Sequence, residues 1–190
     1  MADAAPSLTV HELTVTLLDV SPPVWRRVRV PSPLSLSVLH AVIQIAIGWE
    51  DIHLHEWRIG DITFGPPEEE SWGESIADES SVTLAEVGPP DSAFSYFYDL
   101  GDGWEHLVEV NAVTPYDASV PPLFCLAGER ACPPEDSGGP VGYEHVLDAL
   151  SDPGDAEHDD TVAWLGDRFH PDDLDLGVIN NRLETLWRAV

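Results

Sequence analysis

Residues 8–47 read LTVHELTVTLLDVSPPVWRRVRVPSPLSLSVLHAVIQIAI, and this stretch decides the fold class. Residues 8–17 are rich in Val, Thr and Leu, the residue types that strands favour. Residues 24–30 place Val24, Val28 and Val30 an even number of residues apart, so they share one face of a second strand. The sequence SPP between the two runs interrupts the pattern, because proline has no amide hydrogen to donate. We expect the two runs to pair as a hairpin.

The next segment predicts a helix over residues 35–47. Its apolar residues recur at intervals of three and four, which places them on one face: Leu36, Leu39, Ile43, Ala46 and Ile47. Ser35 is suited to cap the first turn, and Gly48 to end the last one. A strand pair followed by such a helix predicts a sheet with one helix packed across it.

Further strands are predicted at residues 53–59, with a continuation at 62–64, and at 94–98 and 104–113. The last two runs flank the sequence DLGDG, an Asp/Gly turn typical of a hairpin. The acids of this turn alternate with glycines as in half of a calcium loop, but flanking strands favour a tight turn. The pattern therefore predicts an α+β fold with an antiparallel or mixed sheet, arranged somewhat like a β-grasp.

The remaining segments complete the expected domain organisation. Residues 66–90 are acidic and rich in Pro, Gly and Ser, which predicts a surface loop. Helices are expected within 143–150, 159–165 and 178–190, so residues 140–190 form a mostly helical, acidic part. We expect a sheet-rich region over residues 8–113, one domain over 8–190, and a disordered start at residues 1–7.

Charge is the most unusual bulk property. The net charge is −27, and the eight basic residues are all arginines. Six acids and four arginines give residues 1–60 a net charge of −2, so the rest of the chain carries −25. A basic footprint for nucleic acid is missing, and we expect no direct nucleic-acid binding. A solvated surface, cation binding and mimicry of DNA are the three interpretations of this acidity.

The expected compartment is the cytoplasm. No uninterrupted apolar run of about 18 residues is present to span a membrane. The start, MADAAP, lacks the basic and apolar regions of a signal peptide. Two cysteines are too few for a secreted disulfide scaffold.

Four segments carry a resemblance to a known family: PPVWRRVRVP (22–31), LHAVIQIAIGWEDIHLHEWRI (39–59), FSYFYDLGDGWEHLVEV (94–110) and CLAGERACPPEDSGGPVGYEHVLDAL (125–150). Together they resemble the Ri-plasmid ORF-three family, whose members are also labelled insertion-element passenger TnpR proteins. The likeness runs from residue 8 to about residue 185. It implies an association with plasmids and transposable elements and no established catalytic activity. The family motif often has cysteine where this chain has Ser137. A serine resolvase needs a nucleophilic serine among arginines and a basic DNA-binding segment. This chain has neither feature.

Three histidines are the candidate metal ligands. Strand alternation would place His53 and His55 on one face, and His106 on a face of the later hairpin. If the two strands are neighbours, three imidazoles converge, with Asp51, Asp102 or Glu105 nearby. Such a set suits a zinc-like divalent metal. The alternative is that these histidines are hydrogen-bonded core residues.

The segment CLAGERACPPEDSGGPVGY holds candidates for a binding rim, because its Pro-Pro and Gly-Gly pairs predict a loop of fixed shape. These candidates are Cys125, Cys132, Glu135, Asp136 and Tyr143. Six residues separate the cysteines, wider than the usual zinc spacing. A pair closing a small loop, or two buried thiols, is favoured over a metal centre or a catalytic cysteine.

Arg26, Arg27 and Arg29 form a local basic cluster. Alternation places Arg27 and Arg29 on one face and Arg26 among the valines. The cluster is either an anion-binding patch or, as we prefer, the partner of carboxylates in the acidic C-terminal half. For the whole chain we expect an accessory module that acts through protein contacts, with a metal-dependent, hydrolase-like enzyme as the alternative.

Overall fold

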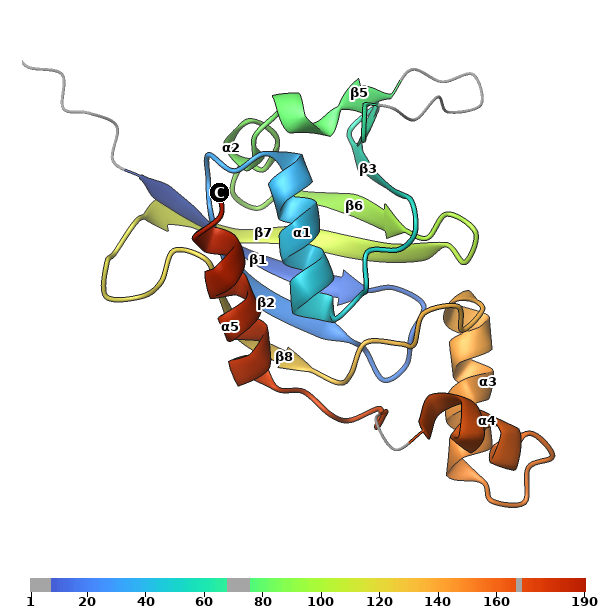
Figure 1. The fold of residues 1–190 in the computed structure, drawn as a ribbon. Coiled ribbons are helices and arrows are strands. Elements are labelled where there is room, and N and C mark those ends of the chain that lie inside the picture. Colours follow the sequence, from blue (N-terminus) through green and yellow to red (C-terminus); the bar gives the residue numbers. More distant parts are fainter. Residues whose placement is uncertain (1–7, 68–75, 167–168) are drawn as a thin grey trace, which may run out of the picture.

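The computed structural model describes residues 8–67, 76–166 and 169–190 (Figure 1). At its centre is an eight-stranded sheet in the order β5-β4-β3-β6-β7-β1-β2-β8. Its strands are β1 (Thr9–Leu17), β2 (Trp25–Pro31), β3 (His55–Ile59), β4 (Ile62–Gly65), β5 (Ala77–Asp78), β6 (Ala93–Tyr98), β7 (Trp104–Pro115) and β8 (Phe124–Glu129). Neighbours run antiparallel except β4 and β5, which are parallel. A mixed α+β class is thus confirmed.

The expected hairpin of residues 8–17 and 24–30 lies in one half of the sheet, with β2 next to the edge strand β8. β1 pairs with β2 on one side and with β7 on the other. Leu13 and Val15 on β1 are fully buried, as are Val28 and Val30 on β2. Burial alternates along both strands because successive side chains point to opposite faces.

The expected helix is α1 (Leu36–Ile47), capped by Ser35, whose hydroxyl accepts a hydrogen bond from the Val38 amide. Gly48 ends it with φ at 121°, a backbone conformation that favours glycine. α1 packs on β2, and a second helix, α5 (Leu176–Trp187), lies beside it on the same face of the sheet (Figure 1). Two helices therefore cover this face, the predicted helix of residues 35–47 and one from the helical C-terminal part.

Residues 66–90 are not a continuous surface loop. They contain β5, a short 3-10 helix η1 (Glu79–Ser81) and a one-turn helix α2 (Leu84–Val87). Glu79 and Leu84 are buried: the Glu79 carboxylate bonds to His55 and Trp57 of β3, and Leu84 belongs to the hydrophobic core. The sequence pattern did not reveal these buried residues because the segment around them is acidic. The stretch 68–75, like the predicted disorder of residues 1–7, lies outside the described residues.

The C-terminal part contains α3 (Gly139–Ser151), α4 (His158–Leu165) and α5. α3 and α4 pack against each other in an arm beside the sheet (Figure 1). Strand β8, which the sequence pattern did not reveal, extends the sheet next to β2. The side chain of Asn180 on α5 bonds both the amide and the carbonyl of Cys125 on this strand. In the described parts, no helix has the length and apolar character to cross a bilayer.

Candidate functional site

The three predicted ligands His53, His55 and His106 do not converge. β6 lies between the strand of His55 and the strand of His106, because β3 pairs with β6 and β6 with β7. His53 is not on a strand, since β3 begins at His55. Among the described residues, the group that could hold a metal ion is a different one: His53, Asp99 and Asp136.

His106 is a core residue. It is fully buried, its Nε2 lies 3.0 Å from Nε1 of Trp49, and its Nδ1 lies 3.2 Å from the carbonyl oxygen of Tyr96. Both ring nitrogens are therefore used. Burial lowers the pKa of His106 to about 4, so the imidazole is neutral at pH 7.

His55 is also occupied within the interior. Its Nε2 lies 3.0 Å from Oε2 of Glu79, which accepts a further hydrogen bond of 2.8 Å from Trp57. The His55 ring stacks on that of His40 with centroids 3.6 Å apart. His40 contacts Tyr96 through Nδ1 and Asp51 through Nε2. This network anchors η1 and α1 to the sheet.

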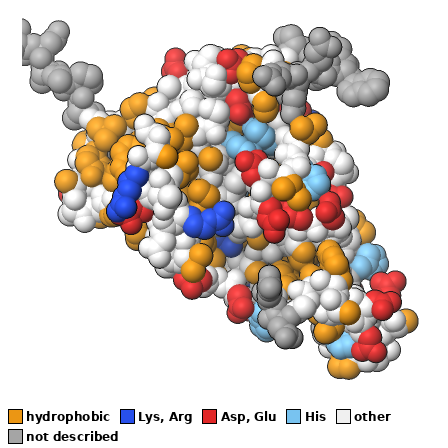
Figure 2. Space-filling view, viewed as in Figure 1, with side chains coloured by type: hydrophobic (Ala, Val, Ile, Leu, Met, Phe, Trp, Pro, Cys, Tyr) orange, Lys and Arg blue, Asp and Glu red, His pale blue; other side chains and the backbone are white. Residues whose placement is uncertain are grey.

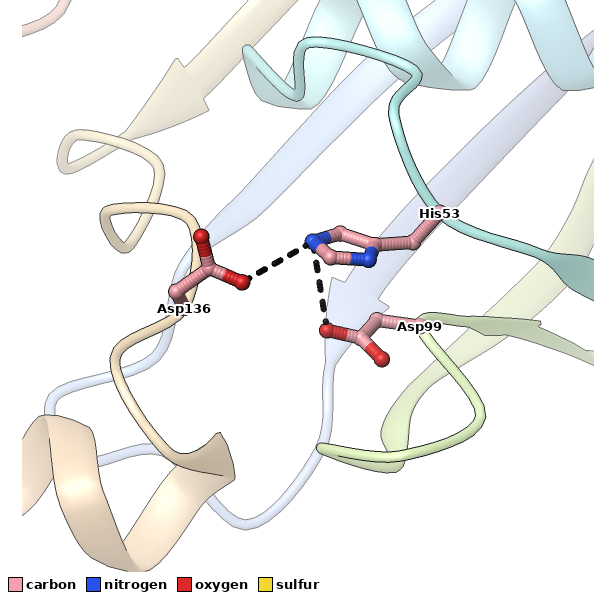
Figure 3. Close-up of side chains that lie close together, drawn as sticks. All are labelled: His53, Asp99 and Asp136. Atoms are coloured by element: carbon pink, nitrogen blue, oxygen red, sulfur yellow. Dashed lines mark ion pairs between the residues drawn. The ribbon is translucent and has the colours of Figure 1, made fainter.

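His53 faces three carboxylates, and Figure 3 shows two of them, those of Asp99 and Asp136. Its Nε2 lies 3.2 Å from Oδ1 of Asp136, 3.5 Å from Oδ2 of Asp99 and 3.8 Å from Oε2 of Glu135. These residues come from the loop before β3, the β6–β7 turn and the loop before α3. Two ligands of a tetrahedral zinc ion, each about 2.1 Å from it, lie about 3.4 Å apart. The distances from His53 to Asp136 and Asp99 match this separation. The ligand atoms of His53, Asp99 and Asp136 all lie within 4.8 Å of one another.

The Asp99 carboxylate is held by its own turn. Oδ1 accepts hydrogen bonds from the amides of Gly101 and Asp102, at 3.0 and 3.2 Å. The Asp99 amide donates to the carbonyl of Leu54, which joins the turn to the segment of His53. Asp99 has φ at 51°, a left-handed conformation that Asp tolerates better than most residues. Its Oδ2 is thereby directed at His53.

The Glu135 carboxylate is fixed in the same way. Oε1 accepts hydrogen bonds from the Glu50 amide at 2.7 Å and from the Tyr98 hydroxyl at 2.9 Å. Oε2 is buried and has no hydrogen-bond partner among the residues that the structure describes, and the same holds for Nε2 of His53. Two buried polar atoms without partners thus lie 3.8 Å apart, a placement that a shared cation would satisfy.

Two other predicted acids lie elsewhere. Asp102 accepts a hydrogen bond from the Gly138 amide, and Glu105 accepts one from the Ser95 hydroxyl. Asp102 thereby holds the loop of Glu135 and Asp136 against the β6–β7 turn. It supports the site without facing His53.

The predicted rim divides into two groups. Glu135 and Asp136 belong to the His53 cluster, with Asp136 at its solvent side. Cys125 and Cys132 are free thiols, and burial raises the pKa of each, which disfavours the reactive thiolate. Tyr143 is buried against Trp104 and Phe169.

The arginine cluster does not bind carboxylates of the C-terminal half. Arg26 is buried and donates to backbone carbonyls of Trp25, Ala46, Ile47, Glu129 and Arg130. Arg27 pairs with Glu12 on β1, and Arg29 lies over the Tyr116 ring. The preferred partner was wrong because the neighbouring strand and the helix end are closer than the acidic helices. The alternation along the strand did predict correctly that Arg26 is buried among the valines and that Arg27 is on the other face.

Asp99 was not among the predicted ligands. The sequence pattern DLGDG predicts only a tight turn, and this explained the aspartate without a ligand role. The turn and the ligand are the same feature here, because the amides that close the turn also orient the carboxylate.

Comparisons with known proteins agree with one another. The sequence signature described as "Plasmid pRiA4b ORF-3-like protein" matches residues 9–178. The chain is 43% identical over 160 residues to the uncharacterised protein y4hQ of Sinorhizobium fredii, covering 83% of this chain and 81% of that protein. It is 34% identical to MM3350, a protein of unknown function from Methanosarcina mazei Go1, whose crystal structure matches with a TM-score of 0.78 over 90% of this chain and 97% of that one. These matches confirm the resemblance seen in the four segments. The chain belongs to the plasmid pRiA4b ORF-3-like family.

Proposed function

We propose that this protein binds a divalent metal ion through His53, Asp99, Glu135 and Asp136. The observation that carries the proposal is the convergence of one imidazole nitrogen and three carboxylate oxygens, two of these atoms buried without hydrogen-bond partners. None of the ion pairs of the described arginines involves these carboxylates. A cation would offset their mutual repulsion.

One nitrogen and three oxygens form a donor set suited to zinc, manganese or iron(II) better than to a thiolate-preferring ion. Asp136 is 73% exposed in its side chain, so the site opens to solvent. A bound divalent ion would lower the pKa of a water molecule and polarise a carbonyl group, which is the chemistry of a metal-dependent hydrolase. The protein's own part is to orient the carboxylates through the Tyr98 hydroxyl and the backbone amides.

The test is metal analysis of protein purified without a histidine tag, followed by calorimetric titration of chelator-treated protein with Zn²⁺ and Mn²⁺. We expect one ion per chain. His53→Gln and Asp136→Asn should each weaken binding about tenfold or more. Asp159→Asn on α4 removes the same charge from an exposed position and should leave the affinity unchanged.

Two results would refute the metal proposal. One is wild-type protein that takes up neither ion. The other is an affinity that falls equally in Asp159→Asn and in the site variants, because that would reflect net charge alone.

The second candidate function is a protein-binding accessory module carried by plasmids and transposable elements. It is favoured by α4, which has no buried residue and leaves Trp164 52% exposed. Exposed tryptophan is typical of interface anchors. A photo-crosslinking amino acid in place of Trp164 should give an adduct in host cells, and one in place of Ser151 on the same arm should not. Equal labelling at both positions would contradict this role.

A further inference from the structure

A groove lies between α1 and α5. Its volume is about 570 Å³, within the range of small-molecule sites. Ile45 of α1 forms one wall, and Val178 and Leu186 of α5 form the other, with Ala189 just beyond the helix. Asn181, Arg182 and Thr185 of α5 complete the lining, so the groove has aliphatic walls with polar side chains between them.

The α5 sequence carries two stripes. Ile179 and Leu183 are buried in the core, as expected for the face that packs on the sheet and α1. The positions 178, 182, 186 and 189 follow one another at intervals of four and three, which places them on a second face. This second stripe is apolar except for Arg182 and lines the groove.

Arg182 differs from the other arginines that the structure describes. Those have backbone, carboxylate or aromatic partners: Arg26 with carbonyls, Arg27 with Glu12, Arg29 over Tyr116, Arg58 with Glu56, Arg130 with Asp172 and Arg188 with Glu184. Within the described residues, Arg182 makes no hydrogen bond or ion pair. It is an exposed guanidinium in a chain of net charge −27, and it lines the groove together with Asn181, Thr185 and the aliphatic side chains.

We propose that this groove binds a small amphiphilic carboxylate. The hydrocarbon body lies against Ile45, Val178 and Leu186, and the carboxylate is held by the planar fork of Arg182. A single guanidinium within a strongly negative protein favours a monoanion over a phosphate or a polyanion. In Figure 2 the basic side chains lie toward the α5 side, with acids beside the outermost of them, and the histidines lie toward the other side, where further acids adjoin them.

The experiment compares three ligands of one chain length: decanoate, decan-1-ol and decyltrimethylammonium. Calorimetry on the full chain below micelle-forming concentrations should show decanoate binding best. The overall negative charge of the protein favours decyltrimethylammonium. Tighter binding of decanoate would therefore report a local effect of Arg182. Arg182→Gln should weaken decanoate about fivefold and abolish its advantage over the alcohol. Val178→Asp should weaken all ligands that bind.

Arg188→Gln is the matched control, because it removes the same charge near the end of α5. Arg188 pairs with Glu184 and does not line the groove. It should leave decanoate affinity unchanged. The proposal is overturned if the three ligands bind alike, if the cation binds best, or if none binds at millimolar concentration. It is also overturned if light scattering shows a dimer that Val178→Asp dissociates, since the groove would then be covered by a second copy of the chain.

Discussion

Nε1 of Trp49 lies 3.0 Å from Nε2 of His106 and fixes the protonation state of that imidazole. An indole N–H can only donate, so Nε2 must accept. The proton of the neutral ring is therefore on Nδ1, which donates to the Tyr96 carbonyl. A second proton on Nε2 would oppose the Trp49 donor in a fully buried position. The neutral tautomer is thus fixed by the packing of two strands, β6 and β7, against the segment that follows α1.

The stability of the protein should consequently fall in acid. The folded-state pKa of His106 is about 4, below the ordinary value of 6.5, so the unfolded chain binds the proton more readily. The contribution is complete above pH 6.5 and is lost as the pH falls toward 4, amounting to about 3 kcal/mol. His106→Gln keeps an acceptor for Trp49 and a donor for Tyr96 but cannot titrate. Urea unfolding from pH 7 to pH 4 should show a shallower loss in this variant.

Exposed His145 on α3 supplies the control for that series. His145→Gln should reproduce the wild-type dependence on pH. If His106→Gln loses stability as steeply as the wild type, then His106 is not the titrating group.

Arg26 should be essential for stability, and its contribution to the free energy of unfolding should not depend on salt. Its guanidinium fills the space between β2, the end of α1 and the residues after β8 with five hydrogen bonds to carbonyl oxygens. Arg26→Lys cannot make this set from a single ammonium group, so we expect a loss of at least about 3 kcal/mol. The partners are carbonyls, so the loss should be the same at low and high salt.

Arg27→Ala removes only an exposed ion pair with Glu12 and should change the unfolding free energy by about 0–1 kcal/mol. Comparable losses in the two variants would show that the carbonyl bonds of Arg26 contribute little.

Tyr98 should act on metal binding without touching the ion. Its hydroxyl accepts from the Ile52 amide and donates to Oε1 of Glu135, so it joins two ligand-bearing loops. In Tyr98→Phe we expect metal affinity to fall about tenfold, because Glu135 loses one of the two donors that orient it. The visible absorption of the Co²⁺-loaded protein should also change, a readout that loss of stability alone would not move. An unaltered spectrum and affinity would rule out this positioning role.

Duplex DNA should not bind at physiological salt. The net charge of −27 gives no driving force from counterion release. A fluorescence anisotropy titration with a random-sequence duplex at about 0.15 M salt should show no saturable change up to micromolar protein. Saturable binding that weakens with added salt would contradict the prediction.

The parts of the fold that could be predicted are those set by local sequence. The periodicity of residues 8–17, 24–30 and 35–47 determines which faces are apolar, and the turn after Tyr98 joins strands that are adjacent in the chain. Strand β8 was missed because its stability comes from pairing with β2, about a hundred residues earlier, and its glycine and alanine give little strand signal.

The candidate site was predicted only in part for the same physical reason. His53 and the acids of the rim were named separately, but their meeting depends on how three loops pack. The order β3-β6-β7 is a non-local property, and it separates His55 from His106 by one strand. Alternation within a strand gives the face of a side chain and carries no information on which strand is its neighbour.

The side-chain amide of Asn180 bonds to both backbone groups of Cys125, as the peptide group of an added strand would. β8 is an edge of the sheet, and an open edge is a template for intermolecular pairing and aggregation. By occupying the amide and carbonyl of Cys125, α5 denies this position to another chain. A single asparagine therefore acts as a block against growth of the sheet from one molecule to the next.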